Sequence, residues 1–214
     1  MQYCLWDNHA EDLIVFFAGW GCDYNQFVNL HDRKNVLILY DYQDLRLDFD
    51  FSAYKNIDVL AYSAGVFVAA VLSDKIPGVK RKVALCGNPY LFDEKLGLSA
   101  ATVAALKAIT LDNYLEFRRK YMVYSEDEYE KYNELQSLRT IESCQSELES
   151  LQKMYQQYAD TIRPKFDKAI IAENDLLFNP AAQKEFYQEK LRIIPHARHH
   201  VFFRFTSFAD ILDY

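Results

Sequence analysis

Six short stretches of apolar residues recur along the chain, and each ends at a turn-forming or small polar residue. They are continuously apolar rather than alternating, which is typical of strands buried on both faces of a mostly parallel sheet. Helical patterns follow Ser63 and Asn179, and Pro180 suits a first helical turn. Strands that alternate with helices predict an α/β fold. The expected strands are LIVFFAG at 13–19, NVLILYDY at 35–42, IDVLAYS at 57–63, KVALCGNP at 82–89, KAIIAEND at 168–175 and LRIIP at 191–195.

Residues 93–163 have a different pattern. From Tyr129 onward, apolar side chains recur every three or four positions, which is the spacing of amphipathic helices. Since no linker or repeat sets this segment apart, we expect a helical lid inserted between two strands of one domain that spans 1–214. The periodic positions are Tyr132, Leu135, Leu138, Ile141, Leu148, Leu151, Tyr155 and Tyr158.

The composition narrows the class of protein. A chain of 214 residues, of which 50% are hydrophobic, can bury one sizeable core. The formal charge of −7 argues against nucleic acid as the main partner, because phosphates need a basic face. The first residues resemble no targeting signal and the apolar runs are too short to cross a bilayer, so we expect a cytoplasmic protein without a membrane partner. Scattered cysteines predict reduced thiols and no metal site; they are Cys4, Cys22, Cys86 and Cys144.

Ser63 lies where an expected strand runs directly into an expected helix, in the segment Ala61-Tyr62-Ser63-Ala64-Gly65. This is the context of a nucleophile elbow, although Ala61 stands where glycine is usual. A serine here could instead simply cap the helix. Candidate acid and base residues, however, follow it in the order Ser, Asp, His. The sequence therefore predicts the α/β-hydrolase fold, with Ser63 as the nucleophile.

Two backbone N–H groups are candidates for an oxyanion hole. Gly19-Trp20-Gly21 follows the first expected strand, and Ala64 follows the nucleophile. Hydrolases of this fold use N–H groups at these two places to stabilise the developing oxyanion. We therefore expect Trp20 and Ala64 to be the donors. The alternative is an ordinary turn at the end of a strand, with Trp20 as part of the core.

The acid and the base are expected at the ends of the last two strands. Asp175 ends KAIIAEND, where a carboxylate would orient the base and stabilise its imidazolium form, and Glu173 is the alternative. The loop after LRIIP contains His196, His199 and His200. A neutral imidazole near pH 7 suits proton abstraction from a serine. The spacing alone does not choose among these three histidines.

Several motifs together resemble one family, the BioG-type pimeloyl-[acyl-carrier protein] methyl ester esterases of biotin biosynthesis. They are FAGWG, YDYQDL with LDFD, the elbow YSAG and the ending HHVFFRF, and the resemblance runs from about Phe16 to the C-terminus. It implies His199 as the base, Asp175 as the acid and the N–H groups of Trp20 and Ala64 as oxyanion donors. It also implies hydrolysis of the methyl ester to pimeloyl-[acyl-carrier protein] and methanol, with no cofactor.

Two other functions are compatible with the same residues. A serine triad serves many activated acyl groups, so a general short-chain carboxylesterase or an acyl thioesterase is one alternative. A hydrolase-like protein that binds an acyl carrier without catalysis is the other.

An acyl carrier protein is acidic, as this chain is, so its docking requires a local cationic cluster. The densest basic run of the expected lid is Arg118-Arg119-Lys120, flanked by aromatic residues that would anchor it while its charges face outward. The competing run at 80–82 precedes an expected strand and should lie away from the site. The alternative for 118–120 is the solvated face of a helix.

Overall fold

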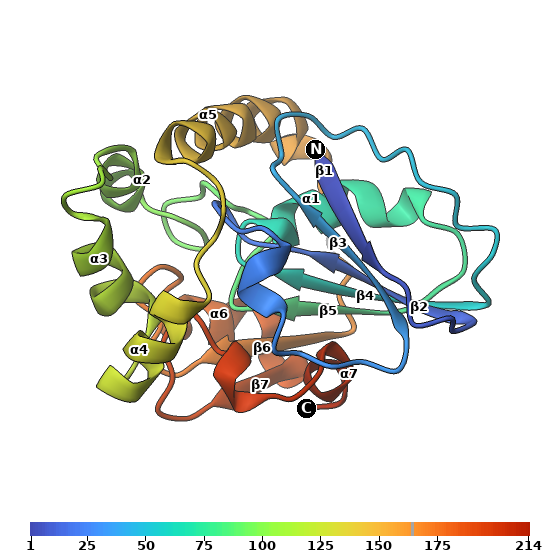
Figure 1. Cartoon of the computed structure of the whole chain (residues 1–214). Helices are drawn as coiled ribbons and strands as arrows, with labels where there is room; N and C mark the ends of the chain where they lie inside the picture. The colour runs from blue at the N-terminus through green and yellow to red at the C-terminus, as the bar shows by residue number, and fades with distance from the viewer. Residues whose placement is uncertain (164) are drawn as a thin grey trace.

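The computed structural model describes residues 1–163 and 165–214, and its centre is a seven-stranded sheet in the order β1-β3-β2-β4-β5-β6-β7 (Figure 1). β1 is antiparallel to β3, and every other neighbouring pair is parallel. The predicted α/β fold with a mostly parallel sheet is therefore confirmed. The strands are β1 (Gln2–Trp6), β2 (Asp12–Phe17), β3 (Asn35–Tyr40), β4 (Asn56–Tyr62), β5 (Val79–Leu85), β6 (Lys168–Ala172) and β7 (Leu191–Ile194).

Helices connect the strands and cover both faces of the sheet. The α-helices are α1 (Gly65–Leu72), α2 (Ala100–Lys107), α3 (Tyr114–Phe117), α4 (Glu126–Glu134), α5 (Ile141–Tyr158), α6 (Pro180–Tyr187) and α7 (Phe208–Asp213). A π-helical turn, η3, spans Arg118–Met122. The short 3-10 helices are η1 (Tyr24–Phe27), η2 (Ser73–Lys75), η4 (Ala159–Thr161), η5 (Gln188–Lys190) and η6 (Phe202–Arg204).

The six expected strands correspond to β2–β7, and two features of the sheet differ from the prediction. The edge strand β1 was not predicted, because the strand has only five residues and these are exposed or partly exposed, so the strand carries little hydrophobic signal. The basic run at 80–82 lies within β5, which begins at Val79, rather than before it. The run therefore lies at the amino end of β5, whereas Ser63 follows the carboxyl end of the neighbouring parallel strand β4.

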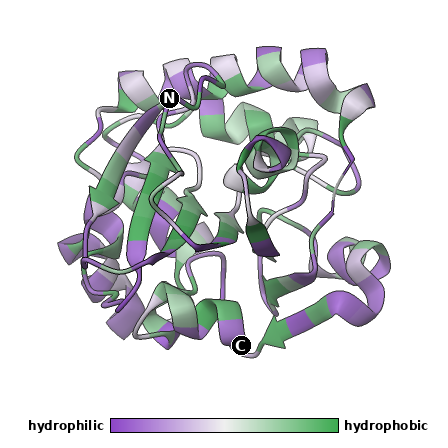
Figure 2. Ribbon diagram, turned by 90° about the vertical axis from the view of Figure 1, so that its right-hand side faces the viewer, coloured by the Kyte–Doolittle hydropathy of each residue, from purple (hydrophilic) through white to green (hydrophobic). Residues whose placement is uncertain are grey.

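The sheet is buried on both faces, which explains the continuous apolar runs. In β2, Leu13, Val15 and Phe17 contribute to one core cluster, while Ile14 and Phe16 contribute to the other, and all five are fully buried. Alternate side chains of a strand point to opposite faces, so both sets must be apolar. α1, α5 and α6 contribute to the first cluster, and η1 and α7 to the second. Figure 2 shows the strands as largely hydrophobic, while hydrophobic and hydrophilic residues alternate along α5, the long helix at the top.

Residues 93–163 contain helices α2 to α5, and α2, α3 and α4 lie beyond the carboxyl ends of the central strands (Figure 1). The periodic stretch after Tyr129 forms two helices rather than one continuous helix. Thr140 caps the start of α5 by accepting a hydrogen bond from the Ser143 N–H, and the segment before it is not helical. Leu138 in that segment is therefore exposed, whereas Leu148 of α5 is buried in the core.

Candidate active site

Ser63 lies at a tight turn between β4 and α1. Its φ is 55°, in the left-handed region, and its N–H donates to the Leu85 carbonyl oxygen at 2.9 Å. Gly65 makes the close approach possible, because a Cβ there would lie 2.3 Å from the Phe17 carbonyl oxygen. Strain of this kind is typical of functional turns. The turn therefore has the geometry expected of a nucleophile elbow.

Asp175, His199 and Ser63 form a continuous hydrogen-bonded chain. His199 Nδ1 lies 2.8 Å from Asp175 Oδ2, and His199 Nε2 lies 2.8 Å from Ser63 Oγ. The other carboxylate oxygen of Asp175 accepts the N–H groups of Leu177 and Phe178, at 2.8 and 3.1 Å. With its proton on Nδ1, the neutral imidazole donates to Asp175 and accepts from the Ser63 hydroxyl. This arrangement can remove the serine proton during attack on an acyl carbon.

The structure separates the three histidines that spacing alone does not distinguish. His199 is buried beside Ser63, and the Phe178 ring stacks on it with 5.8 Å between centroids. His196 is exposed, and its N–H donates to Glu173, which is exposed as well. His200 is buried, and burial lowers its pKa to about 3. Only His199 contacts both other members of the expected triad, whereas Glu173, His196 and His200 lie apart from it.

Ser63 and His199 open into a cavity of about 400 Å³. Trp20 and Ala64 line the same cavity. Neither of their backbone N–H groups has an acceptor within residues 1–163 and 165–214, so both remain free for a ligand. Much of the remaining lining is apolar. It comes from the helices and loops of residues 93–163 and from the loop after β6, and it includes Leu98, Leu106, Ile109, Leu111, Tyr114, Phe117, Met122 and Leu177.

The loop that carries Trp20 is held by α5. The indole N–H of Trp20 donates to the Cys144 carbonyl oxygen at 2.6 Å, and the Gly21 N–H donates to Glu147 Oε2 at 3.0 Å. The second oxygen of Glu147 accepts the Tyr42 N–H at 2.9 Å. A carboxylate of α5 thereby joins the ends of two strands to the helical insertion and fixes the orientation of the loop.

The Glu147 carboxylate is fully buried and paired with Arg139. Arg139 Nη1 lies 2.5 Å from Glu147, and Arg139 Nη2 lies 2.6 Å from Asp41. Burial raises the pKa of Glu147, while Arg139 and the two backbone N–H groups oppose this by favouring the charged form. Glu147 was not among the predicted site residues. The available signal was a charged residue next to Leu148, on the apolar face of an amphipathic helix.

We expect Glu147→Gln to lower kcat about 10- to 100-fold with little change in KM, because misplacing a reacting group slightly costs that much. Glutamine has one acceptor oxygen, and its amide N–H₂ would face a backbone N–H or Arg139. Steady-state kinetics on a methyl ester would measure the effect. Glu149→Gln, an exposed change on the same helix, is the matched control. Equal kcat in the two variants would exclude the positioning role of Glu147.

The basic run in η3 differs from the prediction. Arg118 was expected to face outward, but its side chain is buried with only 1% exposed, and it lines the Ser63 cavity. Its guanidinium lies over the ring of Tyr132 in α4, 4.2 Å from the centroid. Arg119 and Lys120 are exposed, and Arg119 pairs with Glu126 at 2.7 Å. Only these two residues of the run face solvent.

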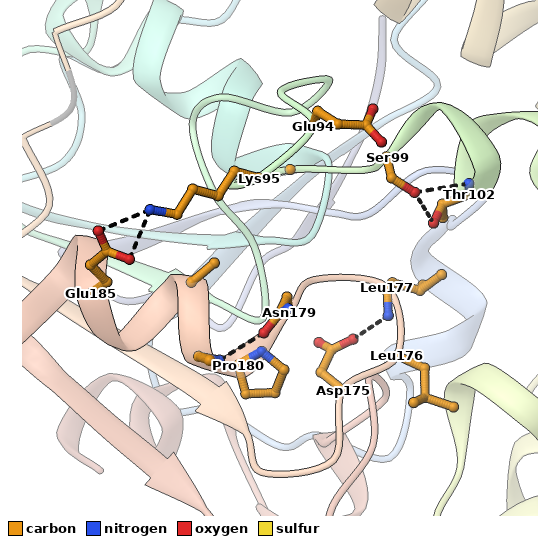
Figure 3. Close-up of a pocket in the computed structure, with 13 residues that line it drawn as sticks. Glu94, Lys95, Ser99, Thr102, Asp175, Leu176, Leu177, Asn179, Pro180 and Glu185 are labelled. Carbon is orange, nitrogen blue, oxygen red and sulfur yellow. Dashed lines mark hydrogen bonds and ion pairs between the residues drawn. The ribbon is translucent and has the colours of Figure 1, made fainter.

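A second cavity, of about 840 Å³, lies on the Asp175 side of the triad (Figure 3). Its polar side chains are largely engaged with one another. Lys95 pairs with Glu185 at 2.9 Å, and the Ser99 hydroxyl caps α2 by accepting the Thr102 N–H. Leu177 lines both cavities. Ser63 and His199 line the smaller cavity and not this one.

The described part of the chain, 1–163 and 165–214, contains no group of three or more His, Cys, Asp or Glu residues that could hold a metal ion. Within the same ranges, no helix is both long and apolar enough to cross a membrane. The four cysteines are free thiols, and Cys22 and Cys86 are the buried ones.

The sheet order and the turn at Ser63 define the class of protein, which is that of the α/β-hydrolase fold. A protein of this fold from Burkholderia ambifaria superposes with a TM-score of 0.62 at 14% identity, covering 98% of this chain and 90% of the other. Residues 1–211 match the family described as pimeloyl-ACP methyl esterase BioG. The chain belongs to this family, which confirms the resemblance seen in its motifs.

Two relatives support the membership. The crystal structure of BioG from Haemophilus influenzae superposes with a TM-score of 0.84 at 30% identity, covering 98% of this chain and 99% of that one. A malonyl-[acyl-carrier protein] O-methyltransferase from Bacteroides fragilis is 34% identical over 188 residues. The match covers 84% of this chain but only 37% of that protein, so the chain corresponds to one part of a longer polypeptide. Fold and family together indicate an esterase with a role in the processing of pimeloyl-ACP methyl ester.

Proposed function

We propose that this protein is a serine carboxylesterase that hydrolyses the methyl ester of pimeloyl-[acyl-carrier protein] to pimeloyl-[acyl-carrier protein] and methanol in biotin biosynthesis. The observation that carries the proposal is the Asp175–His199–Ser63 chain, with two contacts of 2.8 Å, opening into a largely apolar cavity. Membership in the BioG family supports the substrate. The methyltransferase name of one relative agrees with a methyl ester as the bond to be cleaved.

The first half of the reaction forms an acyl-enzyme. His199 Nε2 takes the proton of the Ser63 hydroxyl as the oxygen attacks the ester carbonyl carbon. The carbonyl oxygen becomes an oxyanion, which the free N–H groups of Trp20 and Ala64 stabilise. Collapse of this intermediate breaks the bond to the methoxy group, and His199 returns its proton to release methanol.

The second half repeats the steps with water. His199 takes a proton from a water molecule as its oxygen attacks the acyl carbon, and the same two N–H groups bind the new oxyanion. The bond to Ser63 then breaks, and the protonated His199 returns a proton to the serine oxygen. The pimeloyl group leaves as a free carboxylate on its carrier, while Asp175 holds the imidazole in one tautomer throughout.

The decisive experiment compares substrates. The protein would be incubated with carrier protein bearing a methyl pimeloyl group and, separately, with a nitrophenyl ester of a short acid. We expect release of methanol from the carrier-bound ester with a much higher kcat/KM, and the thioester should remain intact by mass spectrometry.

The alternatives give different products. Release of the free carrier thiol would identify an acyl thioesterase, and similar kcat/KM on both esters would identify a general carboxylesterase. Binding of the carrier without turnover, and without labelling of Ser63 by a fluorophosphonate, would identify a non-catalytic carrier-binding protein.

We expect the double variant Arg119→Glu, Lys120→Glu to raise KM for the carrier-bound ester and to flatten its salt dependence, because exposed charges steer an acidic carrier. A small free ester should be hydrolysed as before. Kinetics at low and high salt would measure both effects. The double variant Lys75→Glu, Lys80→Glu is the matched control, since it makes the same charge change at exposed positions near the amino end of β5. Equal effects of the two double variants would exclude docking at η3.

A further inference from the structure

Arg118 is a buried cation without an anionic partner. One guanidinium N–H group, on Nη2, donates to the Tyr132 carbonyl oxygen. The Nε and Nη1 groups have no hydrogen-bond partner, and no Asp or Glu pairs with Arg118 anywhere in the described ranges 1–163 and 165–214. The rings of Tyr132 and Tyr114 lie 4.2 and 5.4 Å from the guanidinium carbon and contribute cation–π attraction. Two of the three guanidinium nitrogens therefore remain free to donate.

Arg118 lines the cavity that contains Ser63, together with apolar residues of the helical insertion such as Tyr114, Phe117 and Met122. A buried charge that lacks hydrogen-bond acceptors is costly, so an oxygen-bearing ligand in the cavity would gain strongly charge-assisted hydrogen bonds. A substrate whose ester carbonyl reaches Ser63 shares this cavity with the guanidinium.

Gln26 adds a second polar group to the same place. Its side chain is buried, lines the cavity and donates through Nε2 to the Tyr132 hydroxyl at 3.3 Å, while its Oε1 has no partner among the described residues. Because the Tyr132 hydroxyl can donate or accept, turning the amide over only exchanges which of its atoms is free. Arg118 and Gln26 thus flank Tyr132, and each has an unused hydrogen-bonding atom.

The position of Arg118 is coupled to that of the triad. The turn η3 that begins at Arg118 is joined to the loop of His199 by two backbone hydrogen bonds. The His199 N–H donates to the Tyr121 carbonyl oxygen at 3.4 Å, and the His200 N–H donates to the Met122 carbonyl oxygen at 2.8 Å. The guanidinium is therefore held in a defined place relative to Ser63 and His199.

We propose that Arg118 and Gln26 form a polar subsite that binds a second acyl oxygen group, at the far end of the chain whose ester reaches Ser63. This group is either a free carboxylate or the carbonyl oxygen of a thioester. The proposal rests on the proposed function, since it assigns the specificity of the same cavity. The subsite makes the enzyme selective for half-esters of dicarboxylic acids over esters of plain fatty acids, which would leave Arg118 unpaired.

The test uses three methyl esters of the same chain length: monomethyl pimelate, its N-acetylcysteamine thioester and methyl heptanoate. Arg118→Met preserves the apolar volume and removes the donors. We expect it to lower kcat/KM by about 10- to 100-fold on the ester with the preferred second group, and by less than about threefold on methyl heptanoate. A larger loss on monomethyl pimelate identifies a carboxylate ligand, and a larger loss on the thioester identifies a thioester carbonyl.

Arg33→Met, the same change at an exposed arginine before β3, is the matched control and should leave all three rates unchanged. Gln26→Leu should lower kcat/KM on the ester with the preferred second group as well, but to a smaller extent than Arg118→Met. Thermal unfolding would show that each variant is folded. Equal losses on the three esters, or no loss on any of them, would overturn the subsite.

Binding to the Ser63→Ala protein separates the subsite from catalysis. Calorimetry should show tighter binding of the preferred half-ester than of methyl heptanoate, and Arg118→Met in the same background should abolish the difference. If the native protein hydrolyses none of the esters but this binding preference is present, the proposed function fails and the subsite stands. If the native protein hydrolyses them without any such preference, the subsite fails and the esterase stands.

Discussion

Ser63→Ala and His199→Ala should each lower kcat/KM by a factor of about 10⁴ to 10⁶ while leaving the fold intact. In the proposed mechanism the two residues act as one unit: Ser63 Oγ would lose its proton to His199 Nε2 across 2.8 Å, so removing either partner would remove the step. For the same reason, the double variant should be no worse than either single one. Methyl ester hydrolysis and labelling by a fluorophosphonate would measure the loss, with thermal unfolding as the check on folding.

Asp175→Asn belongs to the same experiment and should be severe but milder, with a loss on the order of 10⁴. Asparagine can still accept hydrogen bonds from the Leu177 and Phe178 N–H groups, but it does not carry the charge that stabilises the imidazolium. His196→Ala is the natural control, because its side chain is exposed. His200→Phe is a second control that keeps an aromatic ring among its buried neighbours. Full activity of His199→Ala, with loss in either control, would show that the base is misassigned.

The second large effect concerns Trp20. Trp20→Pro removes a backbone N–H that is free to meet an oxyanion, so we expect a loss of about 100- to 1,000-fold in kcat. Trp20→Phe keeps that N–H but loses the indole hydrogen bond of 2.6 Å to the Cys144 carbonyl oxygen. Its loss should be small, roughly that of one neutral hydrogen bond, or about tenfold at most.

Steady-state kinetics of the two Trp20 variants on one methyl ester would measure this difference. Binding of a transition-state analogue would report on the hole itself, because an oxyanion donor contributes mainly in the transition state. Similar kcat values for Trp20→Pro and Trp20→Phe would exclude the Trp20 N–H as an oxyanion donor.

The sheet and the turn at Ser63 were predictable because the signals for both are local. Strands buried on both faces must be apolar at consecutive positions, and β2 to β7 satisfy this requirement. The elbow needs a serine with small neighbours within five consecutive residues between a strand and a helix, and Ala61 to Gly65 provide them. The edge strand β1 was missed because few of its side chains are buried.

By itself, the sequence determined the α/β fold, the family and the residue types of the candidate site. Contacts between distant segments decide which polar side chains are buried together. His199, for example, contacts Asp175, which is 24 positions away in the sequence, and Ser63, which is 136 positions away. Three histidines within five residues carry the same local pattern, and only the packing of their loop separates them. The same reason applies to Glu147 and Arg118. Amphipathic periodicity places Glu147 on a helix, and the basic run places Arg118 in the expected lid, but only the tertiary structure buries the first against the loop of Trp20 and places the second in the lining of the Ser63 cavity.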